Sequence, residues 1–177
     1  MRTFIQKALD RATWQRFNIR TSLTWAIENG RAYIASDRWE VAAEATDYVE
    51  LVADPDALVR IYDRIIAVDG GRWEVDLLRP ESISPGTDEL QISCLNCTQP
   101  INAVTKFRRG ATNPVNVQTL ERTMIPSRRG PQSAGALQHV DVFRVINGNP
   151  GSVLVLALTN TDGQAHTLNL QVIWSEE

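Results

Sequence analysis

The stretch near the C-terminus from His166 to Trp174 constrains the fold most, because its side chains alternate strictly between two kinds. One side of an extended strand here would carry His166, Leu168, Leu170, Val172 and Trp174, and the other Thr167, Asn169, Gln171 and Ile173. A period of two residues places such sets on opposite faces of a β-sheet. The apolar face then needs a second layer to cover it, which favours a β-sandwich.

The run before it, Ser152–Thr159, contains VLVLAL and is apolar on both faces. This pattern predicts either a central strand covered on both sides or a strand with one face buried against another subunit. Asp162 and Gly163 form a turn signal between the two runs, so we expect a terminal hairpin.

Upstream segments rich in β-branched and aromatic residues predict more strands, divided by Gly, Pro and Asp. These strands are Arg31–Ser36, Trp39–Val41, Tyr48–Ala53, Leu58–Val68, Arg72–Leu78 and Val140–Ile146. The Asp69-Gly70-Gly71 turn predicts a hairpin between the fourth and fifth of them, because glycine accepts the positive φ of tight connections. Together the runs predict a mainly β chain, an antiparallel β-sandwich of jelly-roll type with an N-terminal helical arm.

Residues 79–138 are the least regular part of the sequence, with prolines at positions 80, 85, 100, 114, 126 and 131. Proline removes a backbone donor from a β-ladder, so only short strands such as Glu89–Ser93 and Thr105–Phe107 fit between them. We expect this long excursion to be functional, to lie between subunits or to be mobile.

The first 29 residues predict an arm that precedes a sandwich domain spanning residues 30–177. Thr3 and Gln6 fit a capping box at the start of an amphipathic helix. The helix is expected to end near Phe17, and the stretch up to Trp25 is expected to be extended. The apolar face of the helix would carry Phe4, Ile5, Ala8 and Leu9.

The composition is that of a globular protein, with 177 residues, 43% hydrophobic and 22% charged. No uncharged apolar run approaches the ~20 residues of a membrane-spanning helix. The charged N-terminus also lacks the apolar segment of a secretory signal. We therefore expect synthesis and folding in the cytoplasm and no membrane partner.

Cysteine and histidine are too few and too scattered to predict a metal or cofactor site. Cys94 and Cys97 form a C-x-x-C pair, but zinc needs four ligands, and the two histidines, His139 and His166, are far apart in sequence. Thiol exchange is disfavoured because the motif does not begin a helix in a βαβ unit. We expect no cofactor and two ordinary thiols.

No catalytic motif stands out. The chain has no G-x-S-x-G elbow, no phosphate-binding glycine loop and no EF-hand. Carboxylates are numerous between Asp37 and Glu89, but no two of them are marked as a glycosidase pair. His166 lies beside a turn, where a hydrogen-bonded structural role is the common case. The sequence therefore predicts that the protein is not an enzyme.

The Arg-Arg-Gly motif occurs twice within residues 79–138, with Arg108 and Arg109 in the first copy and Arg128 and Arg129 in the second. They are candidates to bind carboxylates of an acidic neighbouring copy, since guanidinium and carboxylate groups pair well. Residues 37–90, with fourteen acidic and five basic side chains, provide such an acidic region. Solvated loops are the alternative, and nucleic acid is disfavoured because Phe107 alone could stack on bases there.

The five tryptophans divide into two groups. Trp39, Trp73 and Trp174 lie in predicted strands whose alternation places them inward, so core packing explains them. Trp14 and Trp25 lie in the arm, and we expect them to be buried against another protein. A glycan platform, as in carbohydrate-binding modules, is the alternative.

Three segments, taken in order, resemble small virion proteins of tailed bacteriophages. They are GRAYIASDRWEVAAEATDYVELVADPDALVRIYDRIIAVDGGRWEVDLLR, PINAVTKFRRGATNPVNVQT and PGSVLVLALTNTDGQAHTLNLQVIWSEE. In those proteins an opening strand precedes an acidic strand pair, a loop that begins with P-x-N and an aromatic, acidic ending. The likeness covers roughly residues 30–177 and includes neither the arm nor Cys94–Cys97.

The resemblance implies a β-sandwich on the outside of a phage particle, as a capsid decoration or cement protein. Its partners would be the major capsid protein or another virion protein, together with further copies of itself, a trimer being favoured. It implies no catalytic residues. A tail or fibre accessory protein and a carbohydrate-binding module are the alternatives. The residues expected to contact partners are Phe4, Ile5, Ala8, Leu9, Trp14, Trp25, Arg108, Arg109, Arg128 and Arg129.

Overall fold

The computed structural model describes residues 23–53, 57–96, 98, 101–126, 136–140, 144–147 and 153–177. Most of the predicted arm, with Phe4, Ile5, Ala8, Leu9 and Trp14, lies outside these residues, as do Arg128 and Arg129. Residues 23–28 are helical, so the expectation of extended structure is wrong for residues 23–25, while residues 18–22 lie outside the described residues. The turn after this helix is closed by bonds from Asn29 N to Trp25 O and from Gly30 N to Ile27 O, with Gly30 at a positive φ.

The described part of the chain then forms strands β1 to β14. They are β1 (Ala32–Val41), β2 (Thr46–Val52), β3 (Leu58–Val68), β4 (Trp73–Arg79), β5 (Ser82–Ser84), β6 (Asp88–Glu89), β7 (Gln91–Cys94), β8 (Lys106–Arg109), β9 (Thr112–Val115), β10 (Gln118–Ile125), β11 (Ala136–Val140), β12 (Arg144–Asn147), β13 (Leu154–Asn160) and β14 (His166–Glu176).

Several strand predictions need correction. β1 is one strand where the sequence predicted two. Of the predicted Val140–Ile146 strand, Val140 ends β11 and residues 144–146 lie in β12, while residues 141–143 lie outside the described residues. Within residues 79–138 most strands are short, as expected, but β10 has eight residues and was not predicted. β3 matches its prediction residue for residue.

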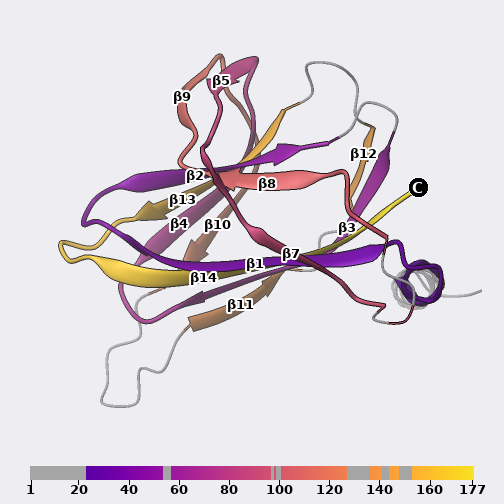
Figure 1. Ribbon diagram of the computed structural model, residues 1–177. Coiled ribbons are helices and arrows are strands. Elements are labelled where there is room, and N and C mark those ends of the chain that lie inside the picture. The colour runs from indigo at the N-terminus through magenta and orange to yellow at the C-terminus, as the bar shows by residue number, and fades with distance from the viewer. Residues whose placement is uncertain are drawn as a thin grey trace, which may run out of the picture.

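Two antiparallel sheets pack face to face, which confirms the predicted β-sandwich (Figure 1). Sheet A has the order β11-β3-β14-β1-β7, with β12 also paired to β3. Sheet B has the order β10-β4-β13-β2-β8-β6. β5 and β9 form a separate two-stranded ribbon.

The strand pairing is nested along the chain. β14 pairs with β1, β13 with β2, β11 and β12 with β3, β10 with β4, β9 with β5, and β8 with β6. β7 then pairs with β1. The strand pairs of the described residues are thus nested, and the outer four pairs alternate between the two sheets.

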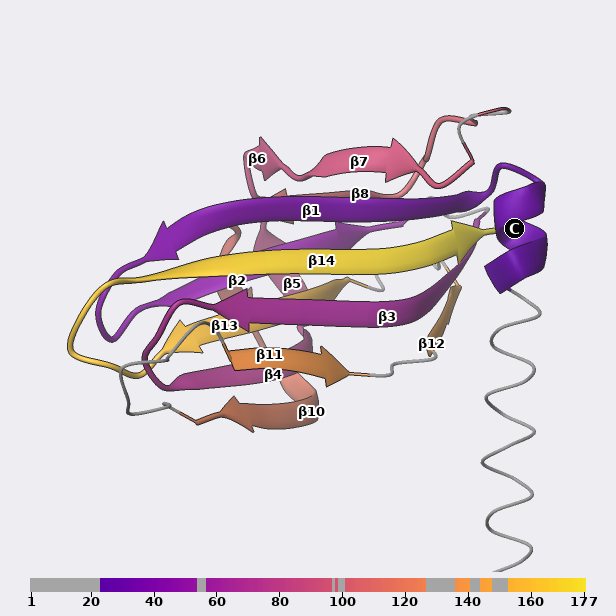
Figure 2. The same ribbon diagram turned by 90° about the horizontal axis from the view of Figure 1, so that it is seen from below.

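The predicted hairpins at Asp69–Gly71 and Asp162–Gly163 are wrong, because the strands on either side of each turn belong to different sheets. β3 lies in sheet A and β4 in sheet B, while β13 lies in sheet B and β14 in sheet A (Figure 2). The β1–β2 connection crosses in the same way. Each of these three connections is an arch, which here means a turn that leads from a strand of one sheet to a strand of the other. An arch can use the same turn residues as a hairpin does.

The core lies between the sheets. β14 is central in sheet A and buries its apolar face there, as its alternation predicted. Trp39, Trp73 and Trp174 are all buried in this core, which confirms their predicted role. The Trp174 ring lies 5.5 Å from that of Tyr33 and 4.9 Å from that of Phe107.

β13, which contains the VLVLAL run, is buried on both faces. Leu154, Leu156 and Leu158 belong to the main core, whereas Val155 and Ala157 form a second cluster with Leu78. Ile83 of β5 packs against that second cluster, so the ribbon of β5 and β9 covers part of the outer face of sheet B. The pattern therefore reflects a central strand covered on both sides by its own chain.

Candidate functional site

The first Arg-Arg-Gly segment lies on β8, where Arg109 contacts acidic residues of the same chain. Its Nη2 lies 3.0 Å from Asp88 Oδ2, and its Nε lies 3.8 Å from Asp37 Oδ2. The guanidinium group also sits 5.1 Å from the centre of the Trp39 ring, a cation–π arrangement. Arg109 therefore joins β8 of sheet B to β1 of sheet A.

Arg108 and Lys106, also on β8, are paired in the same manner. Arg108 lies 3.8 Å from Glu50 and 3.6 Å from Glu89, and Lys106 lies 2.9 Å from Glu89. The hydrogen bond from Lys106 lowers the pKa of Glu89. The carboxylates do come from the acidic region, but from that of the same chain. A partner-binding role for Arg108 and Arg109 stays a prediction.

Glu50 anchors the loop that precedes β6. Its carboxylate is buried and accepts a hydrogen bond of 3.0 Å from the Gly86 backbone N–H. A side chain at Gly86 is excluded, since a Cβ there would lie 2.4 Å from the backbone oxygen of Arg109. The loop and β8 are therefore in direct backbone contact.

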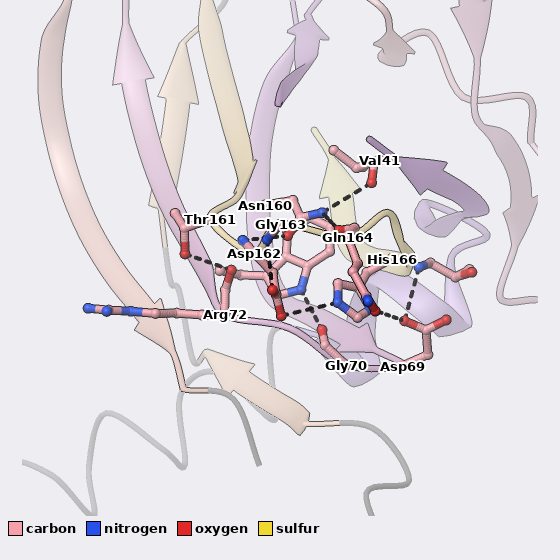
Figure 3. A network of polar contacts seen from close by, with 12 residues as sticks. Val41, Asp69, Gly70, Arg72, Asn160, Thr161, Asp162, Gly163, Gln164 and His166 are labelled. Carbon is pink, nitrogen blue, oxygen red and sulfur yellow. Dashed lines mark hydrogen bonds and ion pairs between the residues drawn. The ribbon is translucent and has the colours of Figure 1, made fainter. Parts of the chain in front are cut away.

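The polar network of Figure 3 lies where the three arches meet. His166 Nδ1 is 3.3 Å from Asp69 Oδ1, and its Nε2 is 3.3 Å from Asp162 Oδ2. A Cβ on Gly71 would lie 2.5 Å from the imidazole ring, so glycine lets that arch pack directly on it. Because both ring nitrogens face carboxylates, His166 acts as a structural bridge between two arches.

Asn160 connects the third arch, between β1 and β2, to the arch between β13 and β14. Its side-chain amide is buried and donates to the backbone oxygens of Val41, Ala42 and Gln164 at 3.2, 3.1 and 2.7 Å. Its Oδ1 accepts a bond of 3.0 Å from the Asp162 N–H. An arch lacks the ladder bonds of a hairpin, so side chains must satisfy its backbone groups. This network performs that structural role.

The described residues include no cluster of three or more metal-ligating side chains. The Cys94 thiol donates to the backbone oxygen of Gly30 at 3.5 Å, and Cys97 lies outside the described residues. In the part of the chain that the structure describes, no helix is long and apolar enough to span a membrane.

A small apolar cavity of about 40 Å³ lies between the two sheets. It is lined mainly by aliphatic side chains of β2, β13 and β14, with Arg64 as its one charged neighbour. Ligand pockets typically have volumes of about 300–1,000 Å³, so this space is a packing defect of the core.

Apolar side chains are exposed at the end of the sandwich that carries the helix and the C-terminus. Trp25 of the helix is 47% exposed, and Ile101 and Val104 of the β7–β8 loop are 48% and 51% exposed. We call these three residues the apolar end. Trp25 is the one member that the sequence identified as a contact residue.

The loop of the apolar end is held firmly against the sandwich. The buried carboxylate of Glu176 accepts hydrogen bonds from the N–H groups of Val104 at 3.0 Å and Thr105 at 2.8 Å. Asn96, after β7, donates to the Glu28 backbone oxygen at 3.3 Å and so links the loop to the helix. Val104 and Trp25 therefore lie in or beside segments that hydrogen bonds tie together, which suits a binding surface.

The outer face of sheet A is a second surface, and the sequence did not identify it. In β14 the outward positions are all uncharged, and the register places Ile34 and Ser36 of β1 and Ile65 and Ala67 of β3 beside them. Charged residues adjoin this group, because Arg38 pairs with Asn169, Glu40 with Thr167 and Asp63 with Ile173. Six half-buried side chains form its centre: Ile34, Ser36, Ile65, Asn169, Gln171 and Ile173. The alternation of β14 could have identified the residues that this strand places on the outer face. The residues beside them on β1 and β3 depend on the strand register, which the sequence does not show.

Comparison with known proteins does not place the chain in a family. No family model matches it, and no curated protein is similar to it in sequence. Its function is therefore inferred from the fold, from the surfaces described above and from the resemblance of three sequence segments to small virion proteins.

Proposed function

We propose that the chain is a structural protein of a tailed-bacteriophage virion, a capsid decoration or cement protein that binds the particle through protein contacts. The apolar end is the observation that supports this proposal most. Exposed aromatic and aliphatic side chains on an ordered scaffold are typical of the centre of a protein–protein interface. The resemblance to small virion proteins provides the phage setting.

We also infer that the sandwich is a jelly roll. The order β1-β14-β3-β11 in one sheet and β2-β13-β4-β10 in the other supports this inference. A jelly roll has eight such strands in two sheets and arises when one long hairpin folds over on itself. β5 to β9 are then an insertion between β4 and β10 that supplies the ribbon, the β6–β7 segment and the loop of the apolar end.

In this proposal Trp25 contacts the particle together with the predicted apolar face of the arm. Further copies of the chain bind in the same way, so that many weak contacts add. A glycan platform is less well supported, because Trp39, Trp73 and Trp174 are in the core and are not available to stack on a sugar.

Co-sedimentation with capsids that lack the protein tests the proposal. The wild-type chain should bind, and Trp25→Ala should weaken binding by more than about tenfold, since a central aromatic contact contributes about 2 kcal/mol. Met124→Ala is the matched control, because Met124 is 44% exposed on sheet B, away from the apolar end. Equal binding by Trp25→Ala and wild type would refute the role of this end. A wild-type chain that ignores capsids but shifts its Trp fluorescence with a glycan would favour the binding module.

A further inference from the structure

The two broad faces of the sandwich are covered differently. The outer face of sheet B lies partly under the β5–β9 ribbon, whose Ile83 packs on Val155 and Ala157 of β13. Among the described residues, no element lies over the middle of the outer face of sheet A, which Figure 2 shows from outside. Four strands, β7, β1, β14 and β3, are adjacent there.

The middle of this uncovered face is an uncharged group of residues with charged residues at its border. Ile34 pairs with Ile173 and Ser36 with Gln171 across β1 and β14, and Gln171 pairs with Ile65 on β3. At the border, Arg38 pairs with Asn169, Glu40 with Thr167 and Asp63 with Ile173. An exposed face usually carries charged side chains, whereas the centre of a protein interface is depleted of them.

The area of the face matches the requirement of a stable pair. β1, β14 and β3 have 10, 11 and 11 residues and β7 has four. At about 4.8 Å between strands and about 3.3 Å per residue, the four strands cover about 600 Å². A specific complex buries at least about 600 Å² on each partner, so this face is sufficient if it meets a surface of equal size. Another copy of the same face is such a surface. Its uncharged middle creates no repulsion between copies, and the charged residues at its border are of both signs.

We propose that the outer face of sheet A binds the same face of a second copy of the chain. The two sheets would pack aligned, as the layers of a sandwich do. Contact of one patch with itself is isologous and closes at two copies, so this surface forms a pair and not the trimer expected from the resemblance. The pairing does not depend on a virion and therefore goes beyond the proposed function.

Sedimentation velocity of the full chain over a range of concentrations tests the pairing. At about 100 µM the wild type should sediment as a dimer of 19.8 kDa chains, since an interface at the lower limit of size is typically micromolar. Gln171→Lys, and separately Ser36→Lys, should weaken the dimer by more than about 30-fold, because each buries an unpaired charge at its centre. Met124→Lys, on sheet B, should leave it unchanged. Circular dichroism and thermal melts confirm that each variant is folded.

Each possible outcome of these measurements either supports or overturns the proposed pairing. Loss of the dimer in both sheet A variants, with folded monomers and an unchanged control, supports the proposal. A wild type that stays monomeric at all concentrations overturns it. So does an assembly of any size that Gln171→Lys and Ser36→Lys do not weaken. Capsid binding is measured separately through Trp25, so failure of the pairing and failure of the particle contact are distinguishable.

Discussion

The outer faces of the two sheets differ although both consist of antiparallel strands of similar length. On sheet B, Arg122 of β10 makes two bonds of 2.8 Å to Asp76 of β4, and the β5–β9 ribbon covers the hydrophobic part of the face. On sheet A the middle of the outer face is uncharged, with Arg38, Glu40 and Asp63 at its border. No described element lies over this middle (Figure 2). The insertion thus covers part of one face, whereas no described residue covers the middle of the other, which is the face of the proposed pairing.

The difference shows why apolar patterning alone does not locate an interface. VLVLAL in β13 is the most apolar run of the sequence, yet its second face is buried by the same chain. The outer face of β14 is mostly polar in sequence, yet it is the face over which no described element lies. Uncharged polar side chains cost little to desolvate when they find hydrogen bonds, so such a face can serve in a reversible contact.

The largest expected effect on stability is seen when an aspartate is placed on the outer face of sheet B and, in a separate variant, on that of sheet A. Val155→Asp should lower the free energy of unfolding by about 4 kcal/mol, because Val155 is fully buried under the ribbon and its replacement buries an unpaired charge. Ile65→Asp on sheet A should cost only about 1 kcal/mol, mainly through strand propensity. Urea unfolding of dilute, monomeric protein measures both. Equal losses would contradict the difference between the faces.

Gly86→Ala should have the next largest effect, because it disturbs the cover of sheet B. The new Cβ would approach the Arg109 backbone oxygen to 2.4 Å, and neither backbone can move without breaking the loop contact. We expect a loss of about 3 kcal/mol, in the range of other steric defects. Gly163→Ala is the matched control, since a Cβ at Gly163 meets no atom within 4 Å. The comparison of melting temperatures is decisive, and a Gly86→Ala protein as stable as Gly163→Ala would refute the close contact.

On the inner side of sheet A, stability should depend on alkaline pH through Tyr33. Burial raises the pKa of Tyr33 to about 12 from 10.0, with smaller contributions from the charges of Glu176 and Cys94. Between pH 10 and 12 the unfolded chain loses this proton and the folded chain keeps it, so the free energy of unfolding should fall as pH rises. The loss is about 2 kcal/mol. Denaturant titrations should show a weaker decline in Tyr33→Phe, and an identical decline in both proteins would exclude Tyr33 as the cause.

The smallest effect is expected in the cavity that the two sheets share. Val172 of β14 lines it, and Val172→Ile adds one methylene to a space of about 40 Å³. The change should raise the free energy of unfolding by about 0.5–1 kcal/mol, the transfer free energy of a buried methylene. Chemical unfolding measures the shift, and a loss of stability would show that the cavity is too narrow to accept the group.

Much of the sandwich was predictable because its strands follow simple alternation. β3 was predicted with its exact bounds, and the two faces of β14 were assigned correctly. The hairpins were not, since Asp69-Gly70-Gly71 and Asp162-Gly163 suit an arch as well as a hairpin, and only tertiary packing decides between them. β10 was missed because its exposed, polar sequence between Pro114 and Pro126 has no apolar alternation.

The surfaces were harder to predict than the strands. Trp25 was identified from its position in the arm, and the structure leaves it half exposed. Arg108 and Arg109 looked free in sequence, but strand pairing brings Asp88 and Glu89 of β6 beside them. Such pairs join residues far apart in the chain, so spacing along the sequence could not reveal them.

Chemical cross-linking through the outer face of sheet A tests the central claim most directly. In a Cys94→Ser, Cys97→Ser background, Gln171→Cys places one thiol at the centre of the face and Met124→Cys places one on sheet B. A short bismaleimide should join two Gln171→Cys chains into a covalent dimer at micromolar protein and leave Met124→Cys monomeric. Cross-linking that is equal at the two positions, or stronger at Met124→Cys, would contradict the account.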